Sequence, residues 1–244
     1  MTKISALIIT HNEAKHIEAC IDSLAGVADE VIVIDSSSDD ETAAIARAKG
    51  AQVIEKKFEG FGGQKNYGAT QAANDYILSI DADEVLSAEL RESITGLKQS
   101  GISGCYYVNR LNHIAGRAVR SCGWYPDIRT RLYDRRKARW DDKPVHEELI
   151  MIEKPTFLSG DLLHFSYDSY EEMKVRADRY GKLAAASLKG KGIFYLALKI
   201  VLNTPAKFLK SYILQKGFTD GYAGWMISRY KARETFMKYY LAIK

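Results

Sequence analysis

Acidic side chains follow an apolar run at residues 77–84, which read Ile-Leu-Ser-Ile-Asp-Ala-Asp-Glu. Asp81 and Asp83 are separated by one residue, so their side chains lie on the same side of an extended backbone. Hard divalent cations prefer carboxylate oxygens, and open α/β sheets bind ligands at the carboxyl ends of their strands. The pair therefore predicts a site for a cation and a charged ligand, although a plain acidic turn has the same pattern.

Four further polar segments lie where they can join this site. They read Thr-His-Asn-Glu at 10–13, Asp-Ser-Ser-Ser-Asp-Asp-Glu-Thr at 35–42, Gly-Phe-Gly-Gly-Gln-Lys-Asn at 60–66 and Trp-Asp-Asp-Lys-Pro-Val-His-Glu-Glu at 140–148. The first two follow neighbouring parallel strands, so we expect them to converge with Asp81 at one edge of a sheet. None is a Walker loop, and no Gly-x-Gly-x-x-Gly follows the first strand, which disfavours an NTPase or an NAD enzyme.

Alternating strands and helices are expected to position these segments. The predicted strands are residues 3–10, 30–35, 51–54 and 75–81, and the predicted helices between them are 13–24, 40–49 and 66–74. Each strand is nearly all apolar, which indicates a parallel sheet covered by helices on both faces. Beyond residue 100 we expect short strands of a mixed sheet at 104–109, at 127–133 and around Trp140, and helices from about residue 169.

Composition is ordinary for a soluble globular protein, with 46% hydrophobic and 27% charged residues in a length of 244. The three cysteines, Cys20, Cys105 and Cys122, have neither metal-type spacing nor a paired framework, which favours a reducing compartment. A strand-like pattern begins directly after Met-Thr-Lys and leaves no room for a signal peptide. We therefore expect the protein to be cytoplasmic.

Charge is unevenly distributed along the chain. Residues 1–164 carry 20 Lys and Arg against 25 Asp and Glu, whereas residues 165–244 carry 15 against 6 and hold nine of the 15 tyrosines. A basic tail suggests an anionic partner, either a membrane or a nucleic acid, but a solvated helical face has the same composition. No nucleic-acid recognition motif is present in the tail, so we expect no nucleic acid.

The apolar stretch 193–202 is interrupted by Lys199 and followed by Pro205. It is too broken for a membrane span, which needs about 20 apolar residues. Apolar and aromatic positions mixed with lysines suit a helix that lies in a membrane interface, and they equally suit packing on the catalytic domain or on a second subunit of a homo-oligomer. We adopt the membrane interpretation, which places the protein on the cytoplasmic face of the inner membrane.

Together the polar segments resemble the family 2 glycosyltransferases of the GT-A fold. The resemblance rests on Ile-Ile-Thr-His-Asn-Glu, Val-Ile-Asp-Ser-Ser-Ser-Asp-Asp-Glu-Thr, Gly-Phe-Gly-Gly-Gln-Lys-Asn, the Asp-Ala-Asp-Glu box and Val-His-Glu-Glu. Within the family the chain is similar to the bacterial subgroup related to lipopolysaccharide core glucosyltransferases. The resemblance implies an α/β GT-A catalytic domain with a Rossmann-like mixed sheet over residues 1–165, and a basic, tyrosine-rich helical tail over residues 166–244.

The activity that the resemblance implies is metal-dependent, inverting hexosyl transfer. The donor would be a nucleotide sugar, UDP-linked in our interpretation, and the acceptor a cell-envelope glycan or glycolipid such as the lipopolysaccharide core. Two alternatives stay open: transfer to a polyprenyl phosphate carrier, and a non-catalytic nucleotide- or glycan-binding module on the same fold.

The resemblance also assigns roles in donor binding. Asp35 would accept a hydrogen bond from a uracil-type N–H, and Glu13 is equally consistent with a first-turn acid stabilised by the helix dipole. Arg129 and Arg131 share a strand face by alternation and suit the diphosphate or an acidic acceptor, or else a solvated basic edge. The full set of nucleotide-sugar-binding residues is Thr10, Asn12, Glu13, Asp35, Lys65, Asp81, Arg129 and Arg131.

Metal and catalytic roles fall on the remaining residues. Asp83 would ligate Mg²⁺ or Mn²⁺ between the donor phosphates, where a cation neutralises the charge of the leaving group. His164 is either a second ligand or a core histidine. Glu147 would deprotonate the acceptor hydroxyl, an effect worth roughly 10²–10⁴-fold in rate, and Glu148 is the alternative. The mechanism would be a single inverting displacement.

Overall fold

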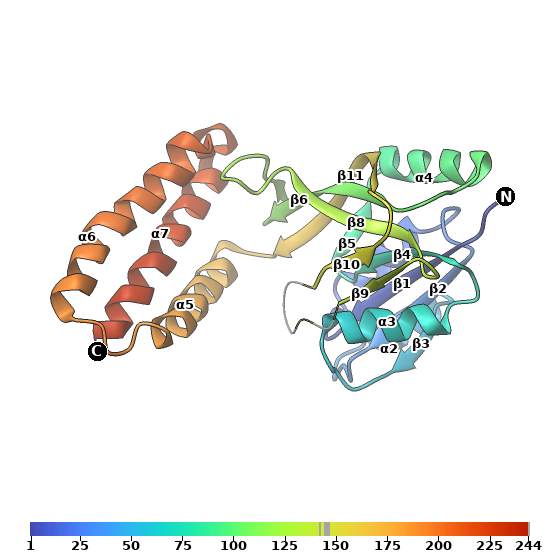
Figure 1. Cartoon of the computed structure of the whole chain (residues 1–244), viewed down its shortest axis with the longest axis horizontal. Coiled ribbons are helices and arrows are strands. Elements are labelled where there is room, and N and C mark those ends of the chain that lie inside the picture. The colour runs from blue at the N-terminus through green and yellow to red at the C-terminus, as the bar shows by residue number, and fades with distance from the viewer. Residues whose placement is uncertain (142, 144–146, 244) are drawn as a thin grey trace. The chain divides into compact units, whose positions relative to one another are not determined.

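The computed structural model describes residues 1–141, 143 and 147–243, and the first third of the chain alternates strands with helices (Figure 1). In order these are β1 (Ile4–Thr10), α1 (Ile17–Ser23), β2 (Glu30–Asp35), α2 (Thr42–Ala48), β3 (Gln52–Glu55), α3 (Phe61–Gln71) and β4 (Tyr76–Asp81). All seven were predicted, but α3 begins at Phe61 rather than at residue 66. The first turn was not predicted because it contains Gly62 and Gly63, and glycine has a low helix propensity.

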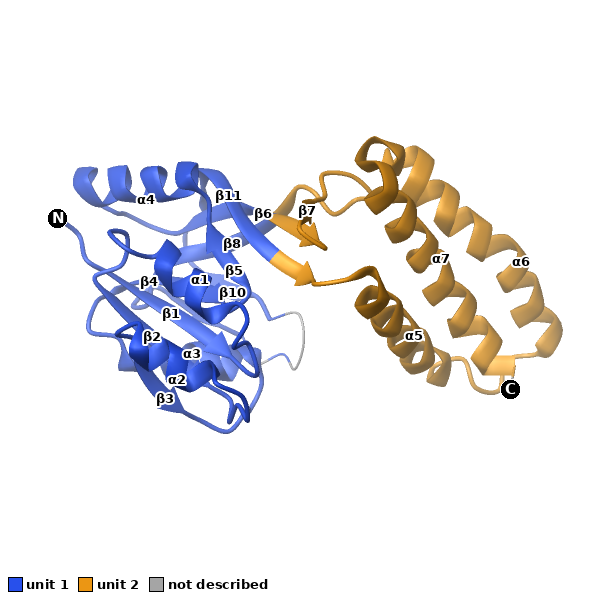
Figure 2. Ribbon diagram, turned by 180° about the vertical axis from the view of Figure 1, so that it is seen from behind, with its two compact units in different colours: residues 1–110, 128–164 blue, residues 111–127, 165–244 orange. Residues whose placement is uncertain are grey.

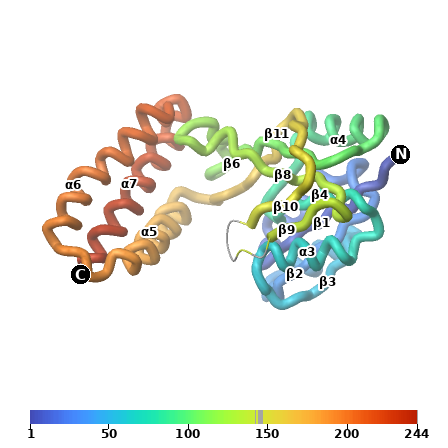
Figure 3. The backbone as a smooth tube through the Cα atoms, viewed as in Figure 1, coloured from blue at the N-terminus to red at the C-terminus, as the bar shows by residue number. Residues whose placement is uncertain are grey.

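Beyond β4 the chain builds the rest of the sheet, as the backbone trace shows (Figure 3). The elements are β5 (Glu84–Leu86), α4 (Ala88–Ser100), β6 (Tyr106–Ile114), β7 (Arg117–Ala118), β8 (Asp127–Asp134), β9 (Ala138–Trp140), β10 (Leu149–Met151) and β11 (Thr156–Tyr167). Helix α4 was not predicted, although Ser87 caps it by accepting a hydrogen bond from the Leu90 N–H at 3.2 Å.

The strand order over the described residues is β3-β2-β1-β4-β8-β6-β11-β5, with β7 paired to β6. Strands β2 and β4 run parallel to β1 on either side of it, whereas β8 is antiparallel to β4. In this register Thr10 lies opposite Asp35, and Ile9 lies opposite Asp81. The carboxyl ends of the three strands are therefore aligned, and the loops that follow them start from one edge.

Both faces of the sheet are buried, which explains the nearly continuous apolar strands. Ile4, Ala6 and Ile8 of β1 belong to one core cluster, while Leu7 and Ile9 belong to the other. This alternation fixes the register, because a slip of one residue would exchange the two sets of side chains.

A second compact unit comprises residues 111–127 and 165–244, and the first comprises residues 1–110 and 128–164 (Figure 2). The second unit contains α5 (Tyr170–Ala186), α6 (Ile193–Leu209), a π-helical turn (Lys210–Leu214), a 3₁₀ turn (Gly217–Asp220) and α7 (Gly221–Ile243). Its helices confirm the predicted C-terminal extension.

Residues 111–127 join this helical unit through Asp220. Its carboxylate accepts hydrogen bonds from the backbone N–H groups of Arg120 and Ser121, at 2.9 and 2.8 Å. The predicted boundary between residues 165 and 166 stays a prediction, and the compact units group this loop with residues 165–244. Over the described residues, no helix combines the length and the apolar content needed to cross a membrane.

Helix α3 packs closely on β1, and this contact is testable through its glycines. A Cβ on Gly68 would lie 2.2 Å from Leu7 Cδ1, whereas a Cβ on Gly63 meets no described atom within 4 Å. Gly68→Ala should therefore destabilise the fold by about 1–3 kcal/mol through overpacking. Gly63→Ala should stabilise it by up to about 1 kcal/mol through helix propensity. Denaturant unfolding measures both, and equal effects would contradict this packing.

Candidate active site

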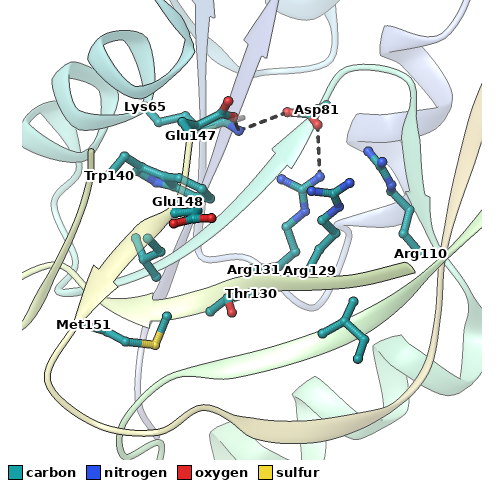
Figure 4. Close-up of a pocket in the computed structure, with 12 residues that line it drawn as sticks. Lys65, Asp81, Arg110, Arg129, Thr130, Arg131, Trp140, Glu147, Glu148 and Met151 are labelled. Carbon is teal, nitrogen blue, oxygen red and sulfur yellow. Dashed lines mark hydrogen bonds and ion pairs between the residues drawn. The ribbon is translucent and has the colours of Figure 1, made fainter. Parts of the chain in front are cut away.

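Two pockets meet at Asp81, at the carboxyl end of β4. The β8 pocket has a volume of about 420 Å³, and its polar lining includes Lys65, Asp81, Arg110, Arg129, Arg131 and Glu147 (Figure 4). The β1 pocket has a volume of about 280 Å³, and its lining includes Thr10, Glu13, Gln64, Asp81, Asp83 and His164. Since Asp81 lines both, a group bound in one pocket lies next to a group bound in the other.

Asp81 is held between two cations. Arg131 Nη2 donates to Asp81 Oδ2 at 2.9 Å, and Lys65 Nζ lies 3.7 Å from Asp81 Oδ1. Burial by itself would raise the pKa of the Asp81 carboxyl, but Arg131 and Lys65 outweigh it and hold that pKa well below its usual range. The carboxylate is therefore charged throughout the neutral pH range.

Glu84 completes this network without lining either pocket. It is fully buried, forms an ion pair with Arg131, and accepts a hydrogen bond from the Asp81 N–H at 2.9 Å. Burial raises the pKa of Glu84 despite the opposing charge of Arg131, and the neighbouring Asp81 charge raises it further. Arg131 thus stabilises two carboxylates at once, and its own pKa is raised by them against the effect of burial.

Lys65 links Asp81 to the loop that carries Glu147. Lys65 Nζ donates to Glu147 Oε1 at 2.6 Å and lies 4.4 Å from the centroid of the Trp140 ring. The Lys65 side chain is only 4% exposed and that of Glu147 only 14%. Such a buried, charge-assisted hydrogen bond fixes the orientation of the glutamate.

The start of α3 explains how this loop reaches Lys65. Asn66 accepts a hydrogen bond from the Trp140 N–H and donates one to the Trp140 carbonyl, both at 2.9 Å. A Cβ on Gly62 would lie 2.0 Å from the Asp141 carbonyl oxygen, so only glycine permits the approach. Gln64 donates to Ser36 Oγ at 2.9 Å and so ties the same turn to the loop after β2.

Asp83 and His164 face each other in the β1 pocket, with His164 Nε2 and Asp83 Oδ2 3.1 Å apart. The pairing of β11 with β5 places His164 opposite Glu84 and so brings it to the acidic box. No group of three or more His, Cys, Asp or Glu side chains forms a metal site among the described residues. Asp83 and His164 are nevertheless oxygen and nitrogen donors that fit a cation whose other ligands are phosphates.

Three buried polar atoms of residues that line the β1 pocket have no hydrogen-bond partner within the described part of the chain. They are Thr10 Oγ1, Gln64 Oε1 and Asp81 Oδ1. A buried polar atom without a hydrogen-bond partner costs about 1–3 kcal/mol, which makes these three atoms candidates for contact with a ligand.

Asp35 and Asn12 organise the loops beside the pockets rather than lining them. The buried Asp35 carboxylate accepts hydrogen bonds from the Ser38 N–H at 2.9 Å and from Ser38 Oγ. Asn12 Oδ1 accepts from the Asp39 N–H at 2.9 Å, and its φ of 56° is left-handed. Their contacts with a donor stay predictions.

The predicted site residues thus divide between the two pockets. The β1 pocket is lined by Thr10, Glu13, Asp83 and His164. The β8 pocket is lined by Lys65, Arg129, Arg131 and Glu147, and Asp81 lines both pockets. His146 lies outside the described residues. Sequence reasoning assigned no role to Arg110, Trp140 or Glu84, and Glu84 alone carried a signal, as the last residue of the acidic box.

A family model described as glycosyl transferase family 2 matches residues 5–147, more than half of the chain. The chain belongs to glycosyl transferase family 2. Its relatives in that family include an uncharacterized glycosyltransferase of Rickettsia bellii, which is 32% identical over 97% of this chain and 84% of its own length. The lipopolysaccharide core biosynthesis glycosyltransferase LpsC of Rhizobium meliloti is 28% identical over 91% of this chain and 85% of its own.

Among solved structures, this family 2 chain is similar to glucosyl-3-phosphoglycerate synthase from Mycobacterium tuberculosis, in complex with Mn²⁺, UDP and glucosyl-3-phosphoglycerate. The match has 26% identity and a TM-score of 0.39, and it covers 46% of this chain and 44% of the synthase. Family membership together with the mixed sheet confirms the expected α/β GT-A fold, and the protein is a glycosyltransferase.

Arg131 should be essential to the fold as well as to the site. Arg131→Met removes the cation that the buried Glu84 shares with the partly exposed Asp81, and leaves them only the longer ion pairs with Arg110 and Lys65, at 3.4 and 3.7 Å. Breaking a buried pair costs about 3–5 kcal/mol, and we expect a loss of about 3 kcal/mol because these two partners remain. Arg129→Met, two residues along the same strand but exposed, is the matched control and should change the unfolding free energy little. Denaturant unfolding of the two variants tests this; similar losses would show that the buried network is unimportant for stability.

Proposed function

We propose that this glycosyltransferase moves a sugar from a UDP-linked donor to a hydroxyl of a cell-envelope glycan, with inversion at the anomeric carbon. One observation carries the proposal: Asp81 separates a pocket that suits a nucleotide diphosphate from a pocket that holds a carboxylate able to act as a base. Donor and acceptor would then meet at Asp81.

The β1 pocket is the proposed donor site. Its hydroxyl and amide groups, Thr10 Oγ1 and Gln64 Oε1, have no internal hydrogen-bond partners among the described residues and are suited to the polar groups of a nucleotide. Two exposed aromatic rings, Phe58 and Phe61, line the same pocket with centroids 5.1 Å apart and offer a surface for a base. Asp35 and Asn12 would act from the adjoining loops.

Asp83 and His164 are the proposed holders of Mg²⁺ or Mn²⁺. When bound with the donor diphosphate, such a cation neutralises the charge that develops on the leaving phosphates. Lys65, buried beside Asp81, would contribute a fixed positive charge on the same side. Asp81 would orient the sugar through its carboxylate, which lines this pocket.

The β8 pocket is the proposed acceptor site, with Glu147 as general base. Lys65 holds Glu147 Oε1, which leaves the other carboxylate oxygen to accept the proton of an acceptor hydroxyl. The hydroxyl oxygen would attack the anomeric carbon from the side opposite the diphosphate, and its proton would pass to Glu147. The bond from that carbon to the phosphate oxygen would break at the same time, and UDP would leave with the bonding electrons. One displacement of this kind inverts the centre and needs no enzyme nucleophile.

A cell-envelope acceptor is supported by the relative LpsC, whose name assigns it to lipopolysaccharide core biosynthesis. Arg129 and Arg110 line the acceptor pocket and suit a glycan that carries phosphate or carboxylate groups. Such acceptors are lipid-linked, so the enzyme would act at the cytoplasmic face of the membrane.

Glu147→Gln should lower kcat by about 10²–10⁴-fold with little change in donor affinity, because the amide cannot accept the proton. Glu148→Gln is the matched control: its side chain is 78% exposed and pairs with Lys143 at 2.9 Å, so its kcat should fall far less. Steady-state kinetics with a UDP-sugar and a core-glycan acceptor measures both. A larger loss in the Glu148 variant would move the base to that residue.

Asp83→Asn should remove the metal-dependent part of donor binding. In thermal shift with UDP, wild-type protein should gain stability on addition of Mn²⁺, because a ligand that binds only the native state raises Tm. The variant should keep the shift from UDP alone and lose the increment from Mn²⁺. Asp22→Asn, which removes an exposed carboxylate from α1, controls for charge. An undiminished Mn²⁺ increment in Asp83→Asn would refute the ligand role.

A further inference from the structure

Helix α6 carries a stripe of exposed apolar side chains. Phe194 is 84% exposed and Val201 is 68% exposed, values unusual for large apolar side chains of a globular protein. The members of the stripe recur at helical spacing, so they lie on one side of the helix. The α6 stripe comprises Phe194, Leu198, Val201, Leu202 and Leu209.

The opposite side of α6 packs on α7. Leu196 is the one buried side chain among the described residues of α6, and Asn203 Nδ2 donates to Tyr239 OH at 2.8 Å. Within the helical unit, α7 lies between α5 and α6, so α6 forms the edge of the helical layer (Figure 2). Helix α6 is therefore apolar on two sides: α7 covers one of them, and the α6 stripe forms the other, exposed side.

The charge around the stripe is of one sign. Residues 179–219 contain no Asp or Glu, and their basic residues are Arg179, Lys182, Lys189, Lys191, Lys199, Lys207, Lys210 and Lys216. The acids at the two borders are already used within the unit. Asp178 Oδ1 accepts from Arg233 Nε at 2.6 Å, and Asp220 holds the loop of residues 111–127. A binding partner that complements the charge of this surface is therefore anionic.

An aromatic cluster lies at the end of α6. The ring of Phe208 is 5.4 Å from that of Tyr212 and 5.1 Å from that of Trp225, which is 44% exposed. Phe218, 54% exposed, lies 6.3 Å from Tyr212. Tyrosine and tryptophan combine an apolar ring with a polar group and are enriched where a membrane meets water.

We propose that α6 and the turn after it bind the surface of an anionic lipid bilayer. The helix would lie in the plane of the interface, with the α6 stripe among the upper acyl chains and the lysines extended to the lipid phosphates. Lys199 in the middle of α6 favours this orientation over insertion across the bilayer. A second copy of the chain is a poorer complement, because a symmetric contact would bring two sets of cations together.

Vesicle sedimentation with the full chain tests the proposal without donor or acceptor, so its outcome is separate from that of the sugar-transfer reaction. Binding should be strong to phosphatidylcholine vesicles containing phosphatidylglycerol and weak to phosphatidylcholine alone. Phe194→Ser with Val201→Ser should weaken binding by about tenfold or more, because apolar area no longer leaves water. Ile152→Ser, which removes an 86% exposed apolar side chain from the other unit, should have no effect.

The charge contribution has its own variant. Lys189→Gln with Lys191→Gln should weaken binding to the anionic vesicles by roughly fivefold per lysine, since a basic residue near such a surface contributes about 1 kcal/mol. All of these positions are exposed, so circular dichroism and Tm should match those of wild type. Trp225 fluorescence should be quenched by brominated lipid, and Trp225→Phe should lose that quenching.

Two outcomes would overturn the proposal. One is vesicle binding that does not depend on the expected features: either the wild-type protein binds anionic and neutral vesicles equally, or the apolar and lysine variants bind anionic vesicles as well as the wild type does. The other is concentration-dependent self-association that Phe194→Ser with Val201→Ser abolishes in sedimentation velocity while no vesicle binding is seen. That result would assign the α6 stripe to contact between two copies.

Discussion

A charged, partly buried carboxylate at the end of strand β4 is the constraint on which the rest of the site depends. Asp81 retains its charge because Arg131 and Lys65 lie on either side of it, and Arg131 in turn requires Glu84. Buried charges are tolerated only when they are paired and hydrogen-bonded. The strand order of the sheet therefore serves this network, because β8 must run beside β4 for Arg131 to reach the carboxylate.

The first half of α3 contributes to the β8 pocket in the same way as strand β8, because it places Lys65 beside Glu147. Gly62 admits the Asp141 carbonyl, Asn66 binds the Trp140 backbone, and Lys65 then meets Glu147. The three residues act together, because without the close approach the lysine would have no glutamate within reach. This explains why glycine stands at position 62 of a helix that it weakens by roughly 1 kcal/mol.

Much of the sheet edge could be predicted from the sequence, because parallel strands and their following loops obey simple rules. Thr10, Asp35 and Asp81 end strands that alternation with helices predicts to be parallel, and the register shows them aligned. The roles of Arg131 and Glu84 could not be predicted, since their partners are 47 to 50 residues distant along the chain or hidden by burial. Local pattern carries no information about which antiparallel strand lies beside β4, nor about the loop 111–127 that joins the helical unit.

Charge is used differently in the two units, and the difference bears on function. In the catalytic unit two cations of the β8 pocket, Lys65 and Arg131, are each paired with acids of the same site, so their charge is balanced within the protein. In the helical unit, residues 179–219 have no acid to neutralise their lysines, and the apolar stripe beside them has no protein cover within that unit. A net positive, apolar surface is unfavourable in water and becomes favourable against anionic lipid. The lysines of residues 179–219 therefore need an anionic partner from outside the chain, which is why we propose a lipid surface for the helical unit, whereas Lys65 and Arg131 already have acidic partners.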